Sequence, residues 1–280
     1  VKIWILCWIF SIIQFFNFFH TSVLGIFCDF YLHWDLRLIH LFTFTYYNIM
    51  HYPRHIAIIP DGNRTWAKER GLDGFFWHLE GFNQMIKIAQ YIYTQTDIEV
   101  FTLWGLSTEN LTNRTQQELD YLFDLYKQIT ENLYELFRQE KVNFRVAGDM
   151  DWLPQDLIDF LIEKQREFYY PKSNKTFVLA VNYGGQDEIL RAMKKLVASG
   201  DVISKENLEK YLDFWGLPPV ELVIRTKQQL AKRLSGFMLW WIGYAQLYFT
   251  DIYCPDFTVK ELQKALDWYE QSLESQNFGK

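Results

Sequence analysis

From about residue 50 to the end of the sequence, short runs of apolar residues alternate with longer segments in which apolar positions recur every three or four residues. Short apolar runs bounded by polar or glycine residues are typical of buried strands, and the longer spacing is typical of helices with one buried face. The pattern predicts six strands, at residues 55–60, 100–106, 143–147, 176–181, 222–224 and 246–249.

Helical spacing fills the intervals between these strands. It predicts helices near residues 65–69, 79–93, 116–139, 157–168, 188–198, 205–214, 237–244 and 259–273. Strands that alternate with helices favour an α/β fold, here with a central, mostly parallel sheet of about six strands flanked by helices. No repeat, Ser/Pro-rich linker or low-complexity tract interrupts residues 50–280. We therefore predict a single domain over 50–280.

Residues 1–49 differ in composition from the rest of the chain. They hold fifteen aromatic residues but only four charged ones, and no charge occurs from residue 3 to residue 28. A membrane span takes roughly 20 apolar residues, so the length suffices, but Gln14 and Asn17 interrupt the stretch. No small-residue cleavage site follows it. Three interpretations stay open: a membrane anchor, a contact between subunits, or a leader outside the working protein, since Met50 directly precedes the first patterned element.

The charge balance argues against some classes of function. The net charge is −6 and the pI is near 5.6, whereas nucleic-acid binding needs clustered Lys and Arg. The three cysteines lie far apart and form no CxxC pair, so neither a zinc site nor a disulfide framework is predicted, and a reducing cytoplasm is the expected compartment. The sequence has no P-loop, dinucleotide-binding, nucleophile-elbow or HExxH motif.

Polar or glycine-containing sequence follows nearly every predicted strand. In open α/β sheets, ligands bind outside the carboxyl ends of the strands. We therefore expect one crevice to be built from these strand tails, at residues 61–63, 107–110, 148–149, 182–185, 225–226 and 250–251.

The tail of the first strand contains Asp61, Gly62 and Asn63. Gly62 permits a tight turn, and Asn63 can cap a helix that begins near Thr65. Free N–H groups at the start of a helix bind anions such as diphosphate. Asp61 could hold Mg²⁺, a hard cation that prefers carboxylate and phosphate oxygens. Taken alone, the local pattern favours an Asp61 that only caps the helix or forms an Asx-turn.

Two further tails offer groups for an anionic ligand. Residues 107–110 (Ser-Thr-Glu-Asn) place a hydroxyl, an acid and an amide at one strand end, although a helix-capping box uses the same residue types. Several cations and a hydroxyl follow the fifth strand, between Arg225 and Ser235. Two arginines there suit bidentate capture of phosphate oxygens. The plain alternative is a solvated basic loop.

Four segments together resemble the undecaprenyl diphosphate synthase family, the cis-prenyltransferases: HIAIIPDGNRTWAKERG (55–71), LSTENLTNR (106–114), VNYGGQDEI (181–189) and RLSGFMLWWIGYAQLYFTDIYCPDF (233–257). The likeness runs in order through residues 53–280. It implies a homodimer that uses Mg²⁺ to condense isopentenyl diphosphate onto an allylic diphosphate such as farnesyl diphosphate. The implied product is a polyprenyl diphosphate with Z double bonds, delivered to a membrane for lipid-carrier synthesis.

The resemblance also implies roles for residues at matching positions. Asp61 matches the essential carboxylate that positions Mg²⁺ and diphosphate, Gln246 a second metal position, and Asn110 the group proposed to assist proton removal. An apolar stripe on the helix at 116–139 could wall the product channel, although any core-facing helix shows such a stripe. The implied substrate-binding residues are Gly62, Asn63, Arg64, Thr65, Trp66, His78, Ser107, Thr108, Glu109, Arg114, Glu118, Arg225, Arg233, Leu234 and Ser235.

Two departures from the family pattern bear on activity. Thr65 stands where the family usually has a second arginine, and Gln246 stands where it has a glutamate. A neutral amide lacks the charge attraction that makes a carboxylate a good ligand for Mg²⁺. Two other functions therefore stay open: a non-catalytic, membrane-associated partner subunit of the same fold, and a phosphate-binding α/β module without chemistry.

Overall fold

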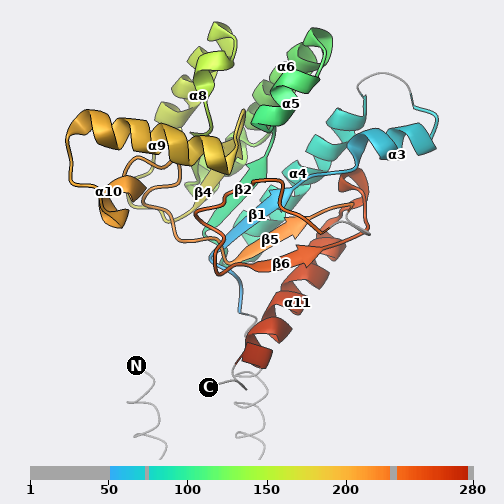
Figure 1. The fold of residues 1–280 in the computed structure, drawn as a ribbon. Helices are drawn as coiled ribbons and strands as arrows, with labels where there is room; N and C mark the ends of the chain where they lie inside the picture. The colour runs from blue at the N-terminus through green and yellow to red at the C-terminus, as the bar shows by residue number, and fades with distance from the viewer. Residues whose placement is uncertain (1–50, 73–75, 228–231, 277–280) are drawn as a thin grey trace, which may run out of the picture. The chain divides into compact units, whose positions relative to one another are not determined.

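A six-stranded parallel sheet forms the centre of the computed structural model, which describes residues 51–72, 76–227 and 232–276. The order across the sheet is β3-β4-β2-β1-β5-β6, and every neighbouring pair is parallel (Figure 1). The predicted α/β fold with a central parallel sheet is therefore confirmed. The strands are β1 (His55–Ile59), β2 (Val100–Trp104), β3 (Asn143–Ala147), β4 (Thr176–Ala180), β5 (Leu222–Arg225) and β6 (Gln246–Phe249).

Burial on both faces of the sheet explains the apolar runs that predicted the strands. Every residue of β1, β2, β4 and β5 is buried. Because side chains alternate between the two faces of a strand, such a strand must contact a layer on each side. Continuous apolar strands are the usual condition of parallel sheets.

One covering layer consists of helices. Aromatic rings join it to the sheet, since Phe137 of this layer lies 5.6 Å, between ring centroids, from Phe177 of β4, which in turn lies 5.4 Å from Phe101 of β2. Contacts also connect the longest helix of the layer to three of the others. The helices are α4 (Phe76–Gln95), α6 (Gln116–Asn132), α7 (Tyr134–Glu140), α8 (Gln155–Glu167) and α11 (Val259–Gln276).

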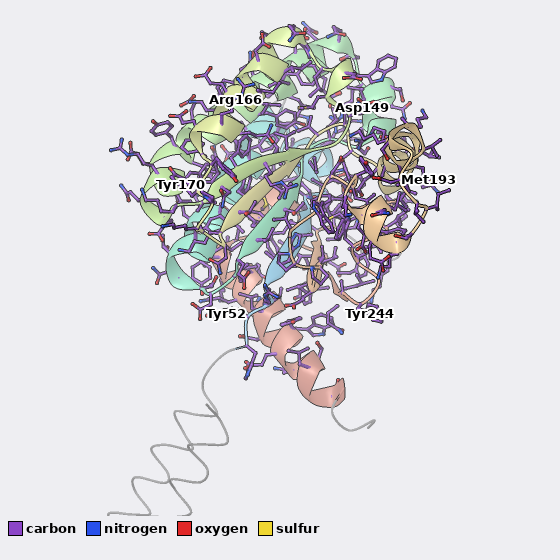
Figure 2. All side chains as sticks on the ribbon, turned by 90° about the vertical axis from the view of Figure 1, so that its left-hand side faces the viewer. Tyr52, Asp149, Arg166, Tyr170, Met193 and Tyr244 are labelled. Atoms are coloured by element: carbon purple, nitrogen blue, oxygen red, sulfur yellow. The ribbon has the colours of Figure 1, made fainter. Side chains whose placement is uncertain are left out.

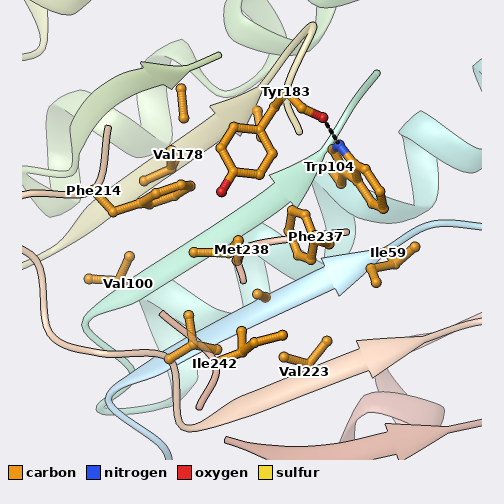
Figure 3. Packing of buried hydrophobic residues seen from close by; sticks show 14 residues of the cluster. Ile59, Val100, Trp104, Val178, Tyr183, Phe214, Val223, Phe237, Met238 and Ile242 are labelled. Atoms are coloured by element: carbon orange, nitrogen blue, oxygen red, sulfur yellow. Dashed lines mark hydrogen bonds between the residues drawn. The ribbon is translucent and has the colours of Figure 1, made fainter. Parts of the chain in front are cut away.

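The opposite face of the sheet is covered by α9 (Gly185–Ser199), by α10 (Lys205–Glu209) and by a segment of turns at 232–245. The rings of Trp104 and Phe237 stack there with centroids 4.6 Å apart. Figure 3 shows this buried cluster, which combines residues of β1, β2, β4 and β5 with Phe214, Phe237, Met238 and Ile242 from the covering segments. The cluster fixes the 232–245 segment against the sheet.

Short helices begin directly after two of the central strands. Helix α3 (Asn63–Glu69) follows β1, and α5 (Thr108–Asn113) follows β2. Figure 1 shows α3 beyond the arrow tip of β1, and α3 packs on α4 and on the 3₁₀ helix η2 (Cys254–Asp256). A second 3₁₀ helix, η1 (Met150–Trp152), follows β3.

The helix predicted at 237–244 is wrong. The chain forms turns there, because Ser235, Gly236 and Met238 have φ angles of 51°, 80° and 47°, outside the helical region. The run is apolar at almost every position rather than on one face. Phe237 and Met238 are both fully buried against the sheet, so tertiary packing overrides the local helical pattern.

Two other predicted helices are shorter than expected. The helix at 116–139 is divided at Leu133, where φ is −94° and ψ is 0°, into α6 and α7. The helix at 205–214 ends at Glu209, and the following turns bury Leu212 and Phe214. Each break redirects apolar side chains into the core, which a helical period cannot indicate.

The predicted hydrophobic segment 1–49 lies outside the described residues, so the division of the chain near residue 50 stays a prediction. Among the helices that the structure describes, none has the length and apolar character needed to cross a membrane.

Candidate active site

A cavity of about 800 Å³ lies at the carboxyl ends of the central strands. The expected crevice is thus formed by the tails of β1, β2, β4 and β5, whereas the tails of the outer strands β3 and β6, at 148–149 and 250–251, are not part of its wall. Polar residues of the wall are Asp61, Asn63, His78, Ser107, Thr108, Glu109, Asn110, Arg114, Tyr183, Gln186, Asp187, Arg225, Lys227, Arg233 and Ser235.

An ion pair joins the tails of β1 and β5. Arg225 Nε donates to Asp61 Oδ2 at 2.8 Å, and Arg225 Nη2 lies 2.6 Å from the same oxygen. Arg225 Nη1 donates to the carbonyl oxygen of Arg233 and to Ser235 Oγ, at 2.5 Å and 3.0 Å. The Arg225 side chain is 7% exposed and that of Asp61 is 39% exposed. One buried guanidinium therefore fixes three residues that the sequence placed in a diphosphate site.

Backbone geometry turns the chain sharply after β1. Gly62 has a φ of 101°, in the left-handed region that favours glycine. Thr226 Oγ1 donates to the carbonyl oxygen of Asp61 at 2.7 Å, and the backbone N–H of Cys254 donates to the same oxygen at 3.0 Å. These bonds hold the Asp61 backbone from two directions, so its carboxyl group is presented to the cavity on a rigid support.

The start of α3 differs from the prediction. The helix begins at Asn63, not near Thr65, and its N-cap is Gly62, which has no side chain to cap it. Asn63 instead donates Nδ2 to the carbonyl oxygen of Pro60 at 3.0 Å. Asn63 Oδ1 lies over Gly81 of α4, at 2.2 Å from the point that a Cβ on that glycine would occupy. Glycine at position 81 therefore makes room for the Asn63 side chain.

The tail of β2 both caps a helix and lines the cavity. Ser107 is the N-cap of α5, because its Oγ accepts the backbone N–H of Asn110 at 3.1 Å. The same four residues, 107–110, also line the cavity. Helix capping and exposure to a ligand are thus compatible at this tail.

A buried carboxylate stands behind the cavity wall. Glu118 accepts hydrogen bonds from Arg114 Nη1 and from Arg64 Nη2, the latter at 3.1 Å, and lies 3.2 Å from His78 Nε2. Burial alone would raise the pKa of Glu118, but the nearby cations and the bond to His78 outweigh it and hold this pKa below its ordinary value. Arg114 and His78 line the cavity, and Glu118 does not. Glu118 therefore positions two wall residues.

The imidazole of His78 is uncharged at neutral pH. Burial, together with the positive charge of Arg114, lowers the pKa of His78 to about 4. Arg114 Nη1 lies 3.2 Å from Nε2 of the ring. A neutral ring at this place can act as a hydrogen-bond partner for substrate without adding positive charge.

Some residues proposed for the site lie outside the cavity wall. Arg64, Thr65, Trp66, Glu118 and Leu234 are not among the residues that line it. Trp66 Nε1 donates to Asp256 Oδ1 at 2.8 Å, which ties α3 to η2. These residues support the wall, and their direct contact with substrate stays a prediction.

The structure does not bring the two predicted metal ligands together within one chain. Gln246 is the first residue of β6 and pairs in register with Leu222, the first residue of β5. Asp61 follows the other end of the neighbouring strand β1. Parallel strands present only their carboxyl ends to the cavity. Gln246 lies at the amino end of β6, so it is on the side of the sheet away from the cavity. No cluster of three or more His, Cys, Asp or Glu side chains suited to a metal occurs among the described residues.

Sequence reasoning missed several residues of the wall. Gly81 and Cys254 line the cavity but were not proposed, and Lys227, a member of the predicted cationic tail, was given no role of its own. Lys227 had a usable signal, since it follows Arg225 in the same cationic tail. Gly81 had none, because its contact with Asn63 joins two segments separated along the chain.

A buried acid connects the cavity to the 232–245 segment. Glu188 of α9, which is 1% exposed, accepts hydrogen bonds from Tyr183 Oη at 2.6 Å, from Trp241 Nε1 at 3.2 Å and from the backbone N–H of Asp213 at 2.9 Å. Tyr183 lines the cavity, and its carbonyl oxygen accepts Trp104 Nε1 at 3.1 Å (Figure 3). Glu188 thus holds one wall strand and the segment that carries Ser235.

We expect Glu188 to make stability depend on pH. Burial, with a contribution from the Asp213 charge, raises the pKa of Glu188 from 4.5 to about 7. The folded state therefore favours the protonated carboxyl group, and this contribution is lost as pH rises through about 7. Relative to a Glu188→Gln variant, the wild type should lose on the order of 3 kcal/mol of unfolding free energy between about pH 5 and about pH 8. Urea unfolding of both proteins at the two pH values measures it, and a parallel pH dependence would contradict the expectation.

Comparison with known proteins agrees with this fold and cavity. A solved structure of lavandulyl diphosphate synthase from Lavandula x intermedia, in complex with dimethylallyl diphosphate, matches with a TM-score of 0.72 at 32% identity, over 78% of this chain and 95% of that chain. Isoprenyl transferases of Treponema denticola and Fusobacterium nucleatum are 39% and 38% identical, each over 78% of this chain and 94% and 93% of their own.

These similarities define the class as that of the prenyltransferases. The family model described as "Putative undecaprenyl diphosphate synthase" matches residues 59–279. The chain belongs to this family, which confirms the resemblance found in the sequence. The family generally uses Mg²⁺.

Proposed function

We propose that this chain is an isoprenyl transferase that condenses isopentenyl diphosphate onto an allylic diphosphate such as farnesyl diphosphate. The double bonds formed have Z stereochemistry, and the product is a polyprenyl diphosphate for lipid-carrier synthesis. The observation that carries the proposal is that Asp61, Arg225 and Arg233 line one cavity, together with family membership over residues 59–279.

The cationic side of the cavity suits diphosphate. Arg225 is held by Asp61 and Ser235, so it is preorganised and does not need to reorder when a ligand binds. Arg233 is exposed and forms no ion pair with any described residue. Departure of diphosphate from an allylic carbon develops negative charge on the leaving oxygens, and fixed guanidinium groups stabilise that charge.

The carboxylate of Asp61 is a suitable ligand for Mg²⁺. Magnesium sites in phosphate enzymes use one or two carboxylates together with substrate phosphates and water. Arg225 occupies Oδ2 of Asp61, whereas Oδ1 accepts no hydrogen bond from the described residues. Bound Mg²⁺ would neutralise part of the diphosphate charge. Gln246 is not proposed as a ligand within the same chain, because it lies at the amino end of its strand and the cavity lies at the carboxyl ends.

The remaining wall supplies apolar surface and a polar loop. Ile59, Phe82, Met85 and Trp104 line the cavity and can receive the hydrocarbon part of the allylic substrate. Asn110 lines it as well and is proposed to assist removal of the proton from isopentenyl diphosphate. The stripe on α6 is buried but does not line the cavity, so its role in a product channel stays a prediction.

Two competing functions make different predictions for one assay. The purified chain is incubated with Mg²⁺, farnesyl diphosphate and labelled isopentenyl diphosphate, and the products are sized by chromatography. Elongated polyprenyl diphosphate is the expected result. Absence of product from the chain alone, with product on adding a second subunit, would favour a non-catalytic partner. Diphosphate binding without elongation under any condition would favour a binding module.

A homodimer is the second part of the proposal. Large apolar side chains are exposed on the side of the sheet that carries α9, and Figure 2 places Met193 and Tyr244 on that side. Tyr244 is fully exposed, and Val202 and Ile203 are about four-fifths exposed. A second copy would bury this surface. Light scattering of the same preparation tests the proposal, because a dimer has twice the molar mass of one chain.

We also propose that the product is delivered to a membrane.

A further inference from the structure

Lys227 has a backbone conformation that lysine seldom adopts. Its φ angle is 54°, in the left-handed region, where a side chain other than glycine is disfavoured. The surrounding chain fixes this conformation. The backbone N–H of Lys227 donates to the carbonyl oxygen of Ile252 at 2.9 Å, and Thr226 is bonded to both Ile59 and Asp61. Strained residues that persist in such a frame concentrate at ligand sites.

The side chain of Lys227 crosses the tail of β1. Its Cβ and Cδ lie 3.0 Å and 3.3 Å from the point that a Cβ on Gly62 would occupy. Its Nζ then donates a hydrogen bond to Thr65 Oγ1. The lysine therefore starts on the β5 tail and ends beside α3, with its stem passing over the glycine that follows Asp61.

The ammonium group carries a charge that the described protein does not neutralise. No described carboxylate forms an ion pair with Lys227, and Asp61, which also lines the cavity, is already paired with Arg225. An ammonium group has three donors, and Thr65 accepts one of them. Lys227 also lines the cavity. A cation so placed has donors to offer to an anionic ligand.

The cations at the cavity thus divide into two groups. Arg225 Nη1 bonds the backbone carbonyl oxygen of Arg233 and the hydroxyl of Ser235, whereas the ammonium group of Lys227 ends at Thr65. Two separate groups suit a reaction with two diphosphate substrates. A lysine that only held α3 in place would not need a left-handed backbone conformation at the cavity wall.

We propose that Lys227 is a further substrate-binding residue, whose ammonium group binds the phosphate oxygens of the allylic diphosphate. The identity of this ligand rests on the proposed function. The isopentenyl diphosphate is then held by the group around Arg225. Thr65 positions the lysine side chain, and Gly62 leaves it the space to cross.

Binding of inorganic diphosphate tests the inference without requiring turnover. Titration by calorimetry, in the presence of Mg²⁺, compares the wild type with Lys227→Met and Lys227→Arg. Loss of one ammonium contact should weaken binding about tenfold, and arginine should retain most of it. Lys68→Met, on the exposed face of α3, removes one positive charge away from the cavity and is the matched control. Equal affinity of wild type and Lys227→Met overturns the inference.

Steady-state kinetics assign the substrate. Lys227→Met should raise KM for the allylic diphosphate about tenfold and leave KM for isopentenyl diphosphate nearly unchanged. A rise confined to isopentenyl diphosphate overturns the assignment. A chain that binds diphosphate through Lys227 but elongates nothing supports the binding residue and contradicts the proposed function.

Two more variants separate binding from structural support. Lys227→Gly relieves the left-handed strain, so it should raise the melting temperature by roughly 2–4 °C while it weakens diphosphate binding. A purely structural lysine would instead lower the melting temperature when removed. In a Lys227→Ser background, Thr65→Lys returns an ammonium group to the same side of the cavity from α3, and affinity should recover in part.

Discussion

Replacing Asp61 with asparagine is expected to lower kcat by about a thousandfold. The substitution keeps the size of the side chain but removes its charge. It deprives the buried Arg225 of its counter-ion and removes the carboxylate proposed to hold Mg²⁺. Both losses weaken the stabilisation of charge on the departing diphosphate. Steady-state assays with labelled isopentenyl diphosphate measure the effect.

Controls must show that the loss concerns the site and not the fold. Asp120→Asn removes an exposed carboxylate on α6, away from the cavity, and should leave kcat near that of the wild type. The Asp61→Asn variant should remain folded by circular dichroism. A variant that keeps more than about a tenth of the wild-type kcat would remove Asp61 from the proposed mechanism.

Replacing Gly81 with alanine is expected to lower kcat/KM by about a hundredfold. The new methyl group would lie 2.2 Å from Asn63 Oδ1 and 3.3 Å from Cys254 Sγ. The Asn63 amide is the end of a side chain and can move, so the fold should survive with a loss of about 1–2 kcal/mol. The movement breaks the bond from Asn63 to Pro60 and displaces a residue of the cavity wall.

Gly243→Ala is the matched control for this prediction. No atom lies within 4 Å of the point that its Cβ would occupy. Kinetics and urea unfolding of both variants separate the two effects. If Gly81→Ala reduced activity no more than Gly243→Ala, the close contact between α4 and Asn63 would have no role in substrate binding.

The fold was predictable because its strands are short, continuous apolar runs. β1, β2, β4 and β5 are buried on both faces, so each appears in the sequence as a continuous apolar run. The 232–245 segment was not predictable in the same way. Its apolar residues occupy nearly every position, and the positive φ angles of Ser235 and Met238 depend on packing against the sheet.

The candidate site was predictable where residues directly follow strands. Asp61, Asn110 and Arg225 could be placed in one crevice because parallel strands end at the same edge of the sheet. Gln246 is the first residue of the strand predicted at 246–249, so it does not lie beside Asp61 within one chain, and its role as a metal position stays a prediction. The supporting contacts of Gly81 and Lys227 join distant segments, and no local pattern records them.

The pairing of β1 with β5 has a consequence for the synthesis of the protein. Asp61 and Arg225 are 164 residues apart in the sequence, and Cys254, further along still, also lines the cavity. When β1 to β4 of a nascent chain have emerged from the ribosome, the sheet still lacks β5 and β6. Asp61 then has no ion pair, because Arg225 has not yet been synthesised. Because contacts between distant residues form late and slowly, the cavity is completed only after β5 and the segment around Cys254 have been synthesised.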